Sequence, residues 1–222
     1  NGPKPSPDPI KFTRIGANGL AKYTSINATT GVRVFNAYMN GDTNQLAVSQ
    51  DVVDAIKAAM PAYQSTLSNA WAFPTGYFTV KSVVQRLHAG GGSLGVYRYY
   101  VLVEAGNATD QWDDRILDVK FQGPSNGYGF MNPLDEATTR AFSDNDEGKR
   151  VALAYRSLVN YADPFVGWMR LKQGSFSVRE LHPCKNSVDF SVDNDLNTNT
   201  KFRNAARWYG DVLATAHARA DV

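Results

Sequence analysis

Glycines with the spacing of phosphate-binding loops lie between two apolar segments in the middle of the chain. The stretch AGGGSLGVYRYYVLVE places Gly90, Gly92 and Gly95 in a G-x-G-x-x-G pattern that also contains Ser93. Lys120 follows on the next apolar segment, RILDVKF. Backbone N–H groups of a glycine turn can contact phosphate oxygens, and a lysine ammonium can neutralise them. The pattern therefore predicts either a phosphate-binding loop with its lysine or a glycine-rich hairpin without a ligand.

The residues after the glycines separate the known uses of this spacing. A dinucleotide fingerprint requires a helix directly after the glycines, because the helix N-terminus holds the pyrophosphate. The segment 91–95 also matches the letters G-x-S-x-G of a hydrolase nucleophile elbow, which needs a helix after its serine. Here the β-branched and aromatic run VYRYYVLVE predicts a strand instead. In protein kinases, the ATP phosphates are covered by a strand, a glycine turn and a second strand, and a third strand supplies a lysine. The predicted elements have the same order.

The elements around the glycines form a predicted antiparallel meander. Strand patterns occur over 77–87, 96–104 and 115–121. A helix over 147–162 has apolar residues at helical spacing and should pack on this sheet, and a further strand is predicted over 175–181. We therefore expect an α+β fold, with an antiparallel sheet and packed helices.

The N-terminal part carries a weaker set of signals. Residues 1–9 include four prolines and are predicted to be an extended tail. Two β-favouring runs, IKFTRI and GVRVFNAYM, flank the turn-rich INATTG within residues 10–39 and predict a hairpin. Ser49 is a candidate N-cap for a helix over 51–60, which should end before Pro61.

The longest helical pattern lies at the C-terminal end, over residues 201–220. Its apolar stripe, expected to be buried, comprises Phe202, Ala205, Ala206, Trp208, Tyr209, Val212, Leu213 and Ala216. The chain thus divides into the tail 1–9, an N-terminal hairpin and helix segment over 10–76, and the glycine-containing part over 77–222.

Five segments, in order, resemble successive blocks of one uncharacterised bacterial family. They are VQRLHAGGGSLGVYRYYVLVE, ILDVKFQGPS, GKRVALAYRSLVNYADPFVGWM, FSVRELHPCKNSVD and YGDVLATAHARAD, and they span about residues 78–221. They are similar to domain-of-unknown-function family twenty-two fifty-two, which is grouped with the protein-kinase-like folds. The resemblance implies that residues 77–222 form a kinase-like nucleotide-binding lobe with its following helix, whereas residues 1–70 show no such resemblance.

The resemblance also implies roles for individual residues in binding ATP with magnesium. The family's glycine loop corresponds to Gly90, Gly92, Ser93 and Gly95, and its strand lysine corresponds to Lys120. Its V-R-x-L-x-x-x-K block corresponds to Arg179 and Lys185. Its helix arginines correspond to Arg150 and Arg156, and its closing A-H-A-R segment corresponds to His217, Arg219 and Asp221. These assignments make the first seven residues candidate ligands of the nucleotide.

Two departures from the family pattern bear on catalysis. Leu153 stands where the family carries a glutamate, so that Lys120 would need another partner, such as Glu147 or Asp146. The family's G-D-x-H-x-x-N segment precedes the glycine loop, and residues 1–77 contain no equivalent. The aspartates that orient an acceptor hydroxyl and hold magnesium in phosphoryl transfer are therefore missing from this chain.

This pattern leaves two functions open. The first is the ATP-covering portion of a kinase-like phosphotransferase of unknown acceptor, completed by an upstream segment of the same protein and inactive as this chain alone. The second is a non-catalytic kinase-like module that senses a nucleotide or binds a protein. The absence of an initiator Met favours the first, because it indicates that something upstream has been removed.

Composition excludes several other classes. Lys and Arg exceed Asp and Glu by only two, without a basic run longer than two residues, so a nucleic-acid partner is not expected. No apolar run approaches the 18 residues of a membrane span. Cys184 is the only cysteine, which excludes an internal disulfide and a cysteine-based metal site and leaves the compartment open.

Other interpretations of the polar residues compete with a phosphate site. Lys120 could instead protect the edge of a sheet from pairing. Asp110, Asp113 and Asp114 form an acidic group that we expect to be a solvated hairpin tip, with a calcium site as the alternative.

Overall fold

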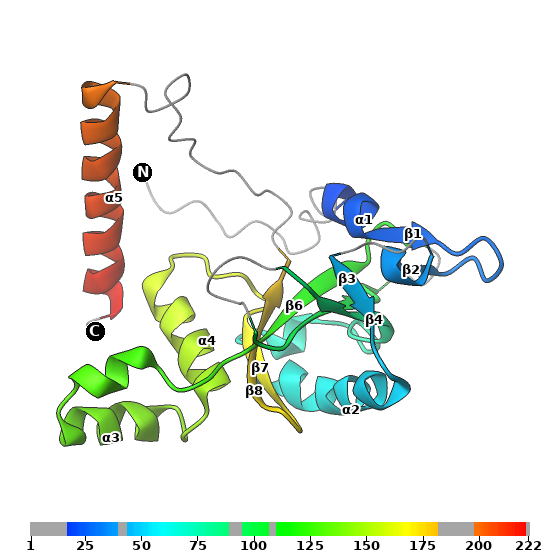
Figure 1. Ribbon diagram of the computed structural model, residues 1–222, viewed down its shortest axis with the longest axis horizontal. Helices are drawn as coiled ribbons and strands as arrows, with labels where there is room; N and C mark the ends of the chain where they lie inside the picture. Colours follow the sequence, from blue (N-terminus) through cyan, green and yellow to red (C-terminus); the bar gives the residue numbers. More distant parts are fainter. Residues whose placement is uncertain (1–16, 40–43, 89–94, 107–109, 182–197, 221–222) are drawn as a thin grey trace.

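The computed structural model describes residues 17–39, 44–88, 95–106, 110–181 and 198–220, and it shows an α+β fold built on antiparallel sheets (Figure 1). The main sheet has six strands in the order β3-β4-β5-β6-β8-β7, and β1 and β2 form a separate pair. The strands are β1 (Thr24–Ile26), β2 (Arg33–Phe35), β3 (Gln45–Ala47), β4 (Val80–Arg86), β5 (Arg98–Val103), β6 (Arg115–Phe121), β7 (Gly167–Leu171) and β8 (Gly174–Glu180). The α-helices are α1 (Ala17–Tyr23), α2 (Gln50–Ser65), α3 (Pro133–Phe142), α4 (Glu147–Leu158) and α5 (Asn199–Ala220), with short 3-10 helices η2 (Asn36–Tyr38), η3 (Ala70–Ala72) and η5 (Asn126–Phe130).

The predicted meander is confirmed. Strands β4, β5 and β6 pair antiparallel in sequence order, and α4 packs against β8 and β7 as the helical spacing indicated. The predicted hairpin is present as β1 and β2 around the INATTG turn. Its first strand is the short segment directly before the turn, whereas IKFTRI lies outside the described residues.

One face of the main sheet forms the larger core, against α2. Val101, Val119 and Phe176 point to this face and are fully buried. From the helix, Ile56 and Tyr63 pack against them, also without exposed surface. This apolar core fills one face of the sheet, so the polar side chains of the central strands lie on the other face.

Helix α2 continues through Pro61, contrary to the prediction that it ends there. Proline removes one helical hydrogen bond and costs roughly 3 kcal/mol in a helix interior. The next turn carries Tyr63, which is fully buried and donates its hydroxyl to the Phe165 carbonyl at 2.7 Å. Burial of a large aromatic side chain with its polar group satisfied offsets the cost, and sequence pattern alone gives no sign of that contact.

Two separate parts of the chain cover the opposite face of the sheet. At one end, α1 and β2 supply Leu20 and Phe35, which pack on Tyr100 and Leu102. At the other end, α4 crosses β7 and β8 at close range. A Cβ on Gly148 would lie 2.5 Å from the Phe176 carbonyl oxygen, so only glycine permits this approach. Between the two covers, this face of the sheet carries a strip of polar side chains from β5, β6 and β8.

Helix α5 is present as predicted, but its apolar stripe is not buried. It runs beside α4 and contributes no buried residue (Figure 1). The prediction was wrong because helical periodicity shows which residues share a face and not what lies against that face.

Candidate functional site

Strand β6 carries the polar side chains that lie between the two covers. Asp118 and Lys120 are two residues apart, so both point to the face on which α4 packs. The register pairs Lys120 with Arg98 on β5, and Asp118 with Arg179 on β8. The antiparallel sheet thus gathers three cations and one carboxylate from three adjacent strands.

The carboxylate is already occupied by arginine. Arg98 donates to both oxygens of Asp118, from Nε and Nη2, each at 2.6 Å. This hydrogen bonding raises the pKa of Arg98 despite the opposing effect of burial. Arg179 lies further away, with Nε 3.6 Å from Oδ2 of Asp118. One positive charge is thereby neutralised by a bidentate pair that is almost completely buried.

Lys120 forms no hydrogen bond or ion pair with the part of the chain that the structure describes, and it lines a pocket. The pocket encloses about 200 Å³ between β6, β8 and α4. Its lining residues are Asp118, Lys120, Gln122, Val151, Ala152, Tyr155, Val166, Ser177, Val178 and Arg179. Polar groups come from the two strands, and the α4 side contributes Val151, Ala152 and Tyr155.

The charge balance of this group suits an anion. Arg98, Lys120 and Arg179 bring three positive charges, and Asp118 brings one negative charge, which leaves a surplus of two. An apolar wall on one side weakens solvent screening and strengthens attraction to a bound charge. The arrangement can therefore hold a dianionic group such as a phosphoryl group.

A magnesium ion does not fit the same pocket. Magnesium requires octahedral oxygen ligands, usually including one or two carboxylates. Asp118 is the only carboxylate among the residues that line the pocket, and two arginines already face it. The residues that line the pocket therefore have the charge to attract an anion and do not form a magnesium ligand set.

The expected acidic partners of Lys120 on α4 are engaged elsewhere. Glu147 accepts from Arg150 and from the Tyr128 hydroxyl, at 2.6 and 3.0 Å. Asp146 caps α4 by accepting from the backbone N–H of Lys149 and also binds Arg170 and Ser175. The prediction that Glu147 or Asp146 pairs with Lys120 is therefore wrong, because the helix N-terminus and neighbouring side chains already use both carboxylates.

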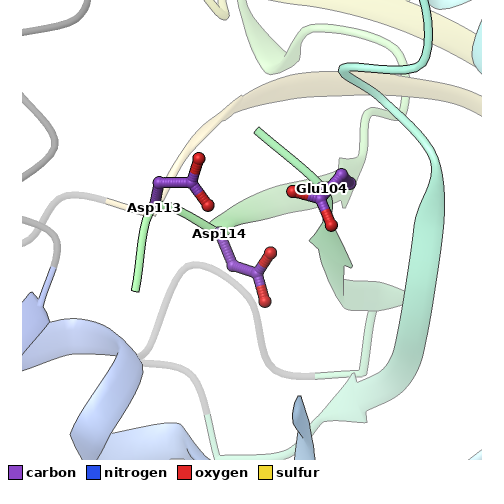
Figure 2. A group of neighbouring side chains, drawn as sticks. All are labelled: Glu104, Asp113 and Asp114. Carbon is purple, nitrogen blue, oxygen red and sulfur yellow. The ribbon is translucent and has the colours of Figure 1, made fainter. Parts of the chain in front are cut away.

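A second charged group occupies the opposite end of β6 (Figure 2). Carboxylate oxygens of Glu104, Asp113 and Asp114 lie within 4.8 Å of one another. Lys81 binds this group, with Nζ 2.8 and 2.9 Å from the Asp114 oxygens and 3.3 Å from Glu104. The ammonium thus already neutralises part of the negative charge that would attract a metal ion. Lys120 lies six positions after Asp114, roughly 20 Å along a strand, so the two groups cannot share one ligand.

The prediction of a solvated hairpin tip is wrong for Asp114. Its side chain has no exposed surface, and Arg33, which is also buried, lies 4.0 Å away. Burial raises the pKa of Asp114 to about 6, although the hydrogen bond from Lys81 acts in the opposite direction. Neighbouring strands and the β1–β2 pair cover the Asp114 side chain. The sequence around Asp114 does not indicate this burial, because the covering elements are distant in the chain.

A sequence model of a family described as uncharacterised proteins conserved in bacteria, DUF2252, matches residues 16–222. The chain belongs to the DUF2252 family. No curated protein and no solved structure matches the chain significantly. The DUF2252 match begins upstream of the region in which the sequence blocks were recognised, so α1, α2 and strands β1 to β3 also belong to the family unit.

The DUF2252 assignments separate into pocket residues and structural residues. Lys120 and Arg179 lie in one pocket. Arg150 instead binds Glu147, and Arg156 donates to the Thr66 and Val166 carbonyls. Arg156 therefore ties α4 to the end of α2 and to the start of β7, whereas the Arg150–Glu147 pair lies within α4.

Four of the seven candidate ligands lie outside the described residues: Gly90, Gly92, Ser93 and Lys185. Gly95 is described, and its φ of 75° is in the left-handed region that favours glycine. His217 and Arg219 lie in the last turn of α5, where cations interact favourably with the helix dipole, and Asp221 is outside the described residues.

Sequence reasoning missed Asp118, the only carboxylate in the pocket. The signal was present in the segment LDVK, because an aspartate two residues before a strand lysine lies on the same face. Arg98 could have been found from the pairing of the meander, because the register places it opposite Lys120.

No helix within the described residues has the length and apolar character needed to cross a membrane.

Proposed function

We propose that this chain is the ATP-covering portion of a kinase-like phosphotransferase of unknown acceptor, in which Lys120 and Arg179 bind phosphate oxygens. The observation that carries the proposal is the surplus of positive charge in the pocket. Arg98 neutralises Asp118, and Lys120 has no partner in the described part of the chain. Two cations thus remain to bind a ligand.

The order of the elements supports this proposal. In protein kinases a glycine loop joins the first two strands, the lysine is on the third strand, and the next helix lies beside that lysine. Here a glycine-rich segment joins β4 and β5, and Lys120 is on β6. The helix that lines the Lys120 pocket is α4, which follows β6 only after η5 and α3. The helix side of the pocket has no carboxylate, and Asp118 supplies a negative charge from the strand instead.

The size of the pocket limits what it can contain. Pockets that enclose a whole small molecule are usually 300–1,000 Å³. The volume of about 200 Å³ is enough for phosphoryl groups and too small for a complete nucleotide. In the proposed complex the phosphates enter the pocket, and the base and ribose lie against the surface outside it.

The proposed roles are binding and orientation. Lys120 and Arg179 attract and align the phosphate oxygens, Arg98 neutralises Asp118, and the apolar wall from α4 limits water. When bound, magnesium would neutralise charge between phosphates, but its ligands are not among the pocket residues. A residue that orients the acceptor hydroxyl is also absent from the pocket. We therefore expect this chain alone to bind without transferring phosphate.

A second candidate is a non-catalytic nucleotide-sensing or protein-binding module. It is favoured because the pocket has a single carboxylate, Asp118, and arginines already face it, so that no carboxylate remains to hold magnesium for phosphate transfer. The two functions differ in turnover, because a phosphotransferase releases ADP from ATP in the presence of acceptor or water, and a sensor only binds. An ADP-release assay on the full-length protein separates them.

Calorimetric titration of Mg-ATP into the purified protein tests nucleotide binding, which both the phosphotransferase and the nucleotide sensor require. Lys120→Ala should weaken binding by about tenfold to a hundredfold, since a charged hydrogen bond contributes roughly 1.5–3 kcal/mol. Lys172→Ala is the matched control, because Lys172 is an exposed lysine in the turn between β7 and β8. Equal affinity in both variants, or no binding to folded wild-type protein, would refute the assignment of Lys120.

A further inference from the structure

Two serines on β8 point to the same face of the sheet but use their hydroxyl groups differently. Ser175 and Ser177 are two residues apart, so both side chains point to the face on which α4 packs. The Ser175 hydroxyl accepts from the backbone N–H of Gly148 at 2.8 Å and donates to the Asp146 carboxylate. The donor and an acceptor position of Ser175 are therefore both used within the fold, at the start of α4.

The Ser177 hydroxyl is used only as an acceptor. Gln122, directly after β6, donates from Nε2 to Ser177 Oγ at 2.7 Å. A serine hydroxyl carries one hydrogen and two lone pairs. No residue in the described part of the chain accepts that hydrogen. Ser177 therefore has a donor available for a ligand.

The position of Ser177 places this donor in the Lys120 pocket. The register pairs Ser177 on β8 with Lys120 on β6. Both residues line the pocket, together with Gln122 and Arg179. Paired residues on one face of an antiparallel sheet have Cβ atoms about 4.5–5.5 Å apart. One small group in the pocket can therefore contact Lys120 and Ser177 together.

The chemistry of these neighbours indicates which kind of ligand atom fits. Lysine and arginine side chains have hydrogen-bond donors and no acceptor. The pocket carboxylate, Asp118, already accepts from Arg98 with both oxygens. The matching ligand atom therefore accepts hydrogen bonds and carries negative charge, as an ionised phosphoryl oxygen does.

We propose that Ser177 is a binding residue of the phosphate pocket, where it donates its hydroxyl hydrogen to a phosphoryl oxygen beside Lys120, and that Gln122 positions this hydroxyl. The inference rests on the proposed function, because it adds a neutral donor to the site of Lys120 and Arg179. Attraction to the two cations depends mainly on distance, whereas a hydrogen bond also requires a defined angle. Ser177 thus sets the orientation of the phosphoryl group.

Calorimetric titration with tripolyphosphate, and separately with Mg-ATP, tests Ser177. Threonine and valine have nearly the same shape, and only threonine keeps the hydroxyl. We expect Ser177→Thr to bind tripolyphosphate within about twofold of the wild type and Ser177→Val about tenfold more weakly, the lower end for a hydrogen bond to a charged group. Ser157→Ala is the control, because Ser157 is an exposed serine of α4 outside the pocket.

Salt separates the neutral donor from the cations. Dissolved ions screen the attraction between a polyanion and a lysine or arginine. Lys120→Ala should therefore make tripolyphosphate binding less dependent on salt. Ser177→Val should instead weaken binding by the same factor in roughly 0.05 M and roughly 0.3 M salt.

A double substitution tests the positioning role of Gln122. Gln122→Ala should weaken tripolyphosphate binding by a few fold in the wild-type protein. It should have no further effect in the Ser177→Val variant, because the amide acts through the hydroxyl. Additive losses would make Gln122 a direct ligand and overturn its positioning role.

The outcomes distinguish this inference from the proposed function. Equal binding by Ser177→Thr and Ser177→Val, with weaker binding by Lys120→Ala, would overturn the role of Ser177 and leave that of Lys120. The expected difference with tripolyphosphate, but no binding of Mg-ATP, would support Ser177 and refute the nucleotide function. No binding of either compound to folded protein would overturn both. If Ser177→Val unfolds, Ser177→Ala replaces it.

Discussion

The two ends of β6 carry charged groups that differ in how their charges are balanced. At the Asp114 end, Lys81 and Arg33 face three carboxylates, and the lysine binds two of them directly. At the Lys120 end, three cations face the single carboxylate Asp118. The first group already contains its own counter-charge, whereas the second has positive charge left over.

We interpret this difference as a distinction between charges that stabilise the fold and charges that we propose for ligand binding. A lysine bound by buried carboxylates contributes to folding, because removal of one partner leaves the others uncompensated. A lysine without a protein partner in the described structure contributes little to folding and is available to a ligand. Lys81 and Lys120 should therefore respond in opposite ways to the same substitution.

The largest expected effect on stability is that of Lys81→Met. It leaves Glu104, Asp113 and Asp114 close together without the ammonium that binds two of them, and it should lower the free energy of unfolding by about 3–5 kcal/mol at pH 8. Urea unfolding followed by circular dichroism measures the change. An unaltered midpoint would show that Lys81 is not the counter-charge of this group.

The second prediction concerns pH and Asp114. Its pKa is raised in the folded protein from an ordinary 3.8 to about 6. The associated stabilisation is fully present below about 3.8 and is lost as the pH rises through 6, which amounts to about 3 kcal/mol. Relative to Asp114→Asn, wild-type protein should lose stability between pH 4 and 7. Parallel stability profiles of the two proteins over this range would contradict the raised pKa.

The third prediction is that Asp118→Asn lowers stability while it strengthens polyphosphate binding. Arg98 loses a bidentate carboxylate partner, which should cost about 2 kcal/mol in the free energy of unfolding. The pocket gains one net positive charge, so tripolyphosphate should bind a few times more tightly. Unfolding and calorimetry on the same variant measure both effects, and weaker tripolyphosphate binding would contradict the charge-surplus account.

The smallest expected effect on stability is that of Lys120→Met. Without a partner in the described structure, its loss should change the free energy of unfolding by less than about 0.5 kcal/mol. The same variant should lose most of its affinity for Mg-ATP. A destabilisation comparable to that of Lys81→Met would make Lys120 a structural residue and remove the basis of the comparison.

Much of the sheet could be predicted from the sequence because its signals are local. Strands β4, β5, β6 and β8 have β-branched and aromatic runs bounded by turn residues, and α4 has a regular apolar period. Strand β7 is only GWMRL, too short to give such a pattern. Helix α3 has no buried residue, but its start was visible as Asn132 followed by Pro133, a capping residue and an N1 proline.

The candidate site was predictable in part. Lys120 and Arg179 were identified, and the sheet register brings them to one pocket. Spacing did not predict that Lys120 lacks an acidic partner in the described structure, because Glu147 and Asp146 are committed to contacts made by distant strands and loops. The burial of Asp114 and the exposure of the α5 stripe likewise depend on tertiary packing, which periodicity does not report.

The most direct test of the central claim is a crystal structure of the protein with ADP or a non-hydrolysable ATP analogue. Our account predicts phosphate oxygens within about 3 Å of Lys120 Nζ and of the Arg179 guanidinium, with the Arg98–Asp118 pair intact. Nucleotide bound at another surface, with Lys120 free of phosphate, would contradict it.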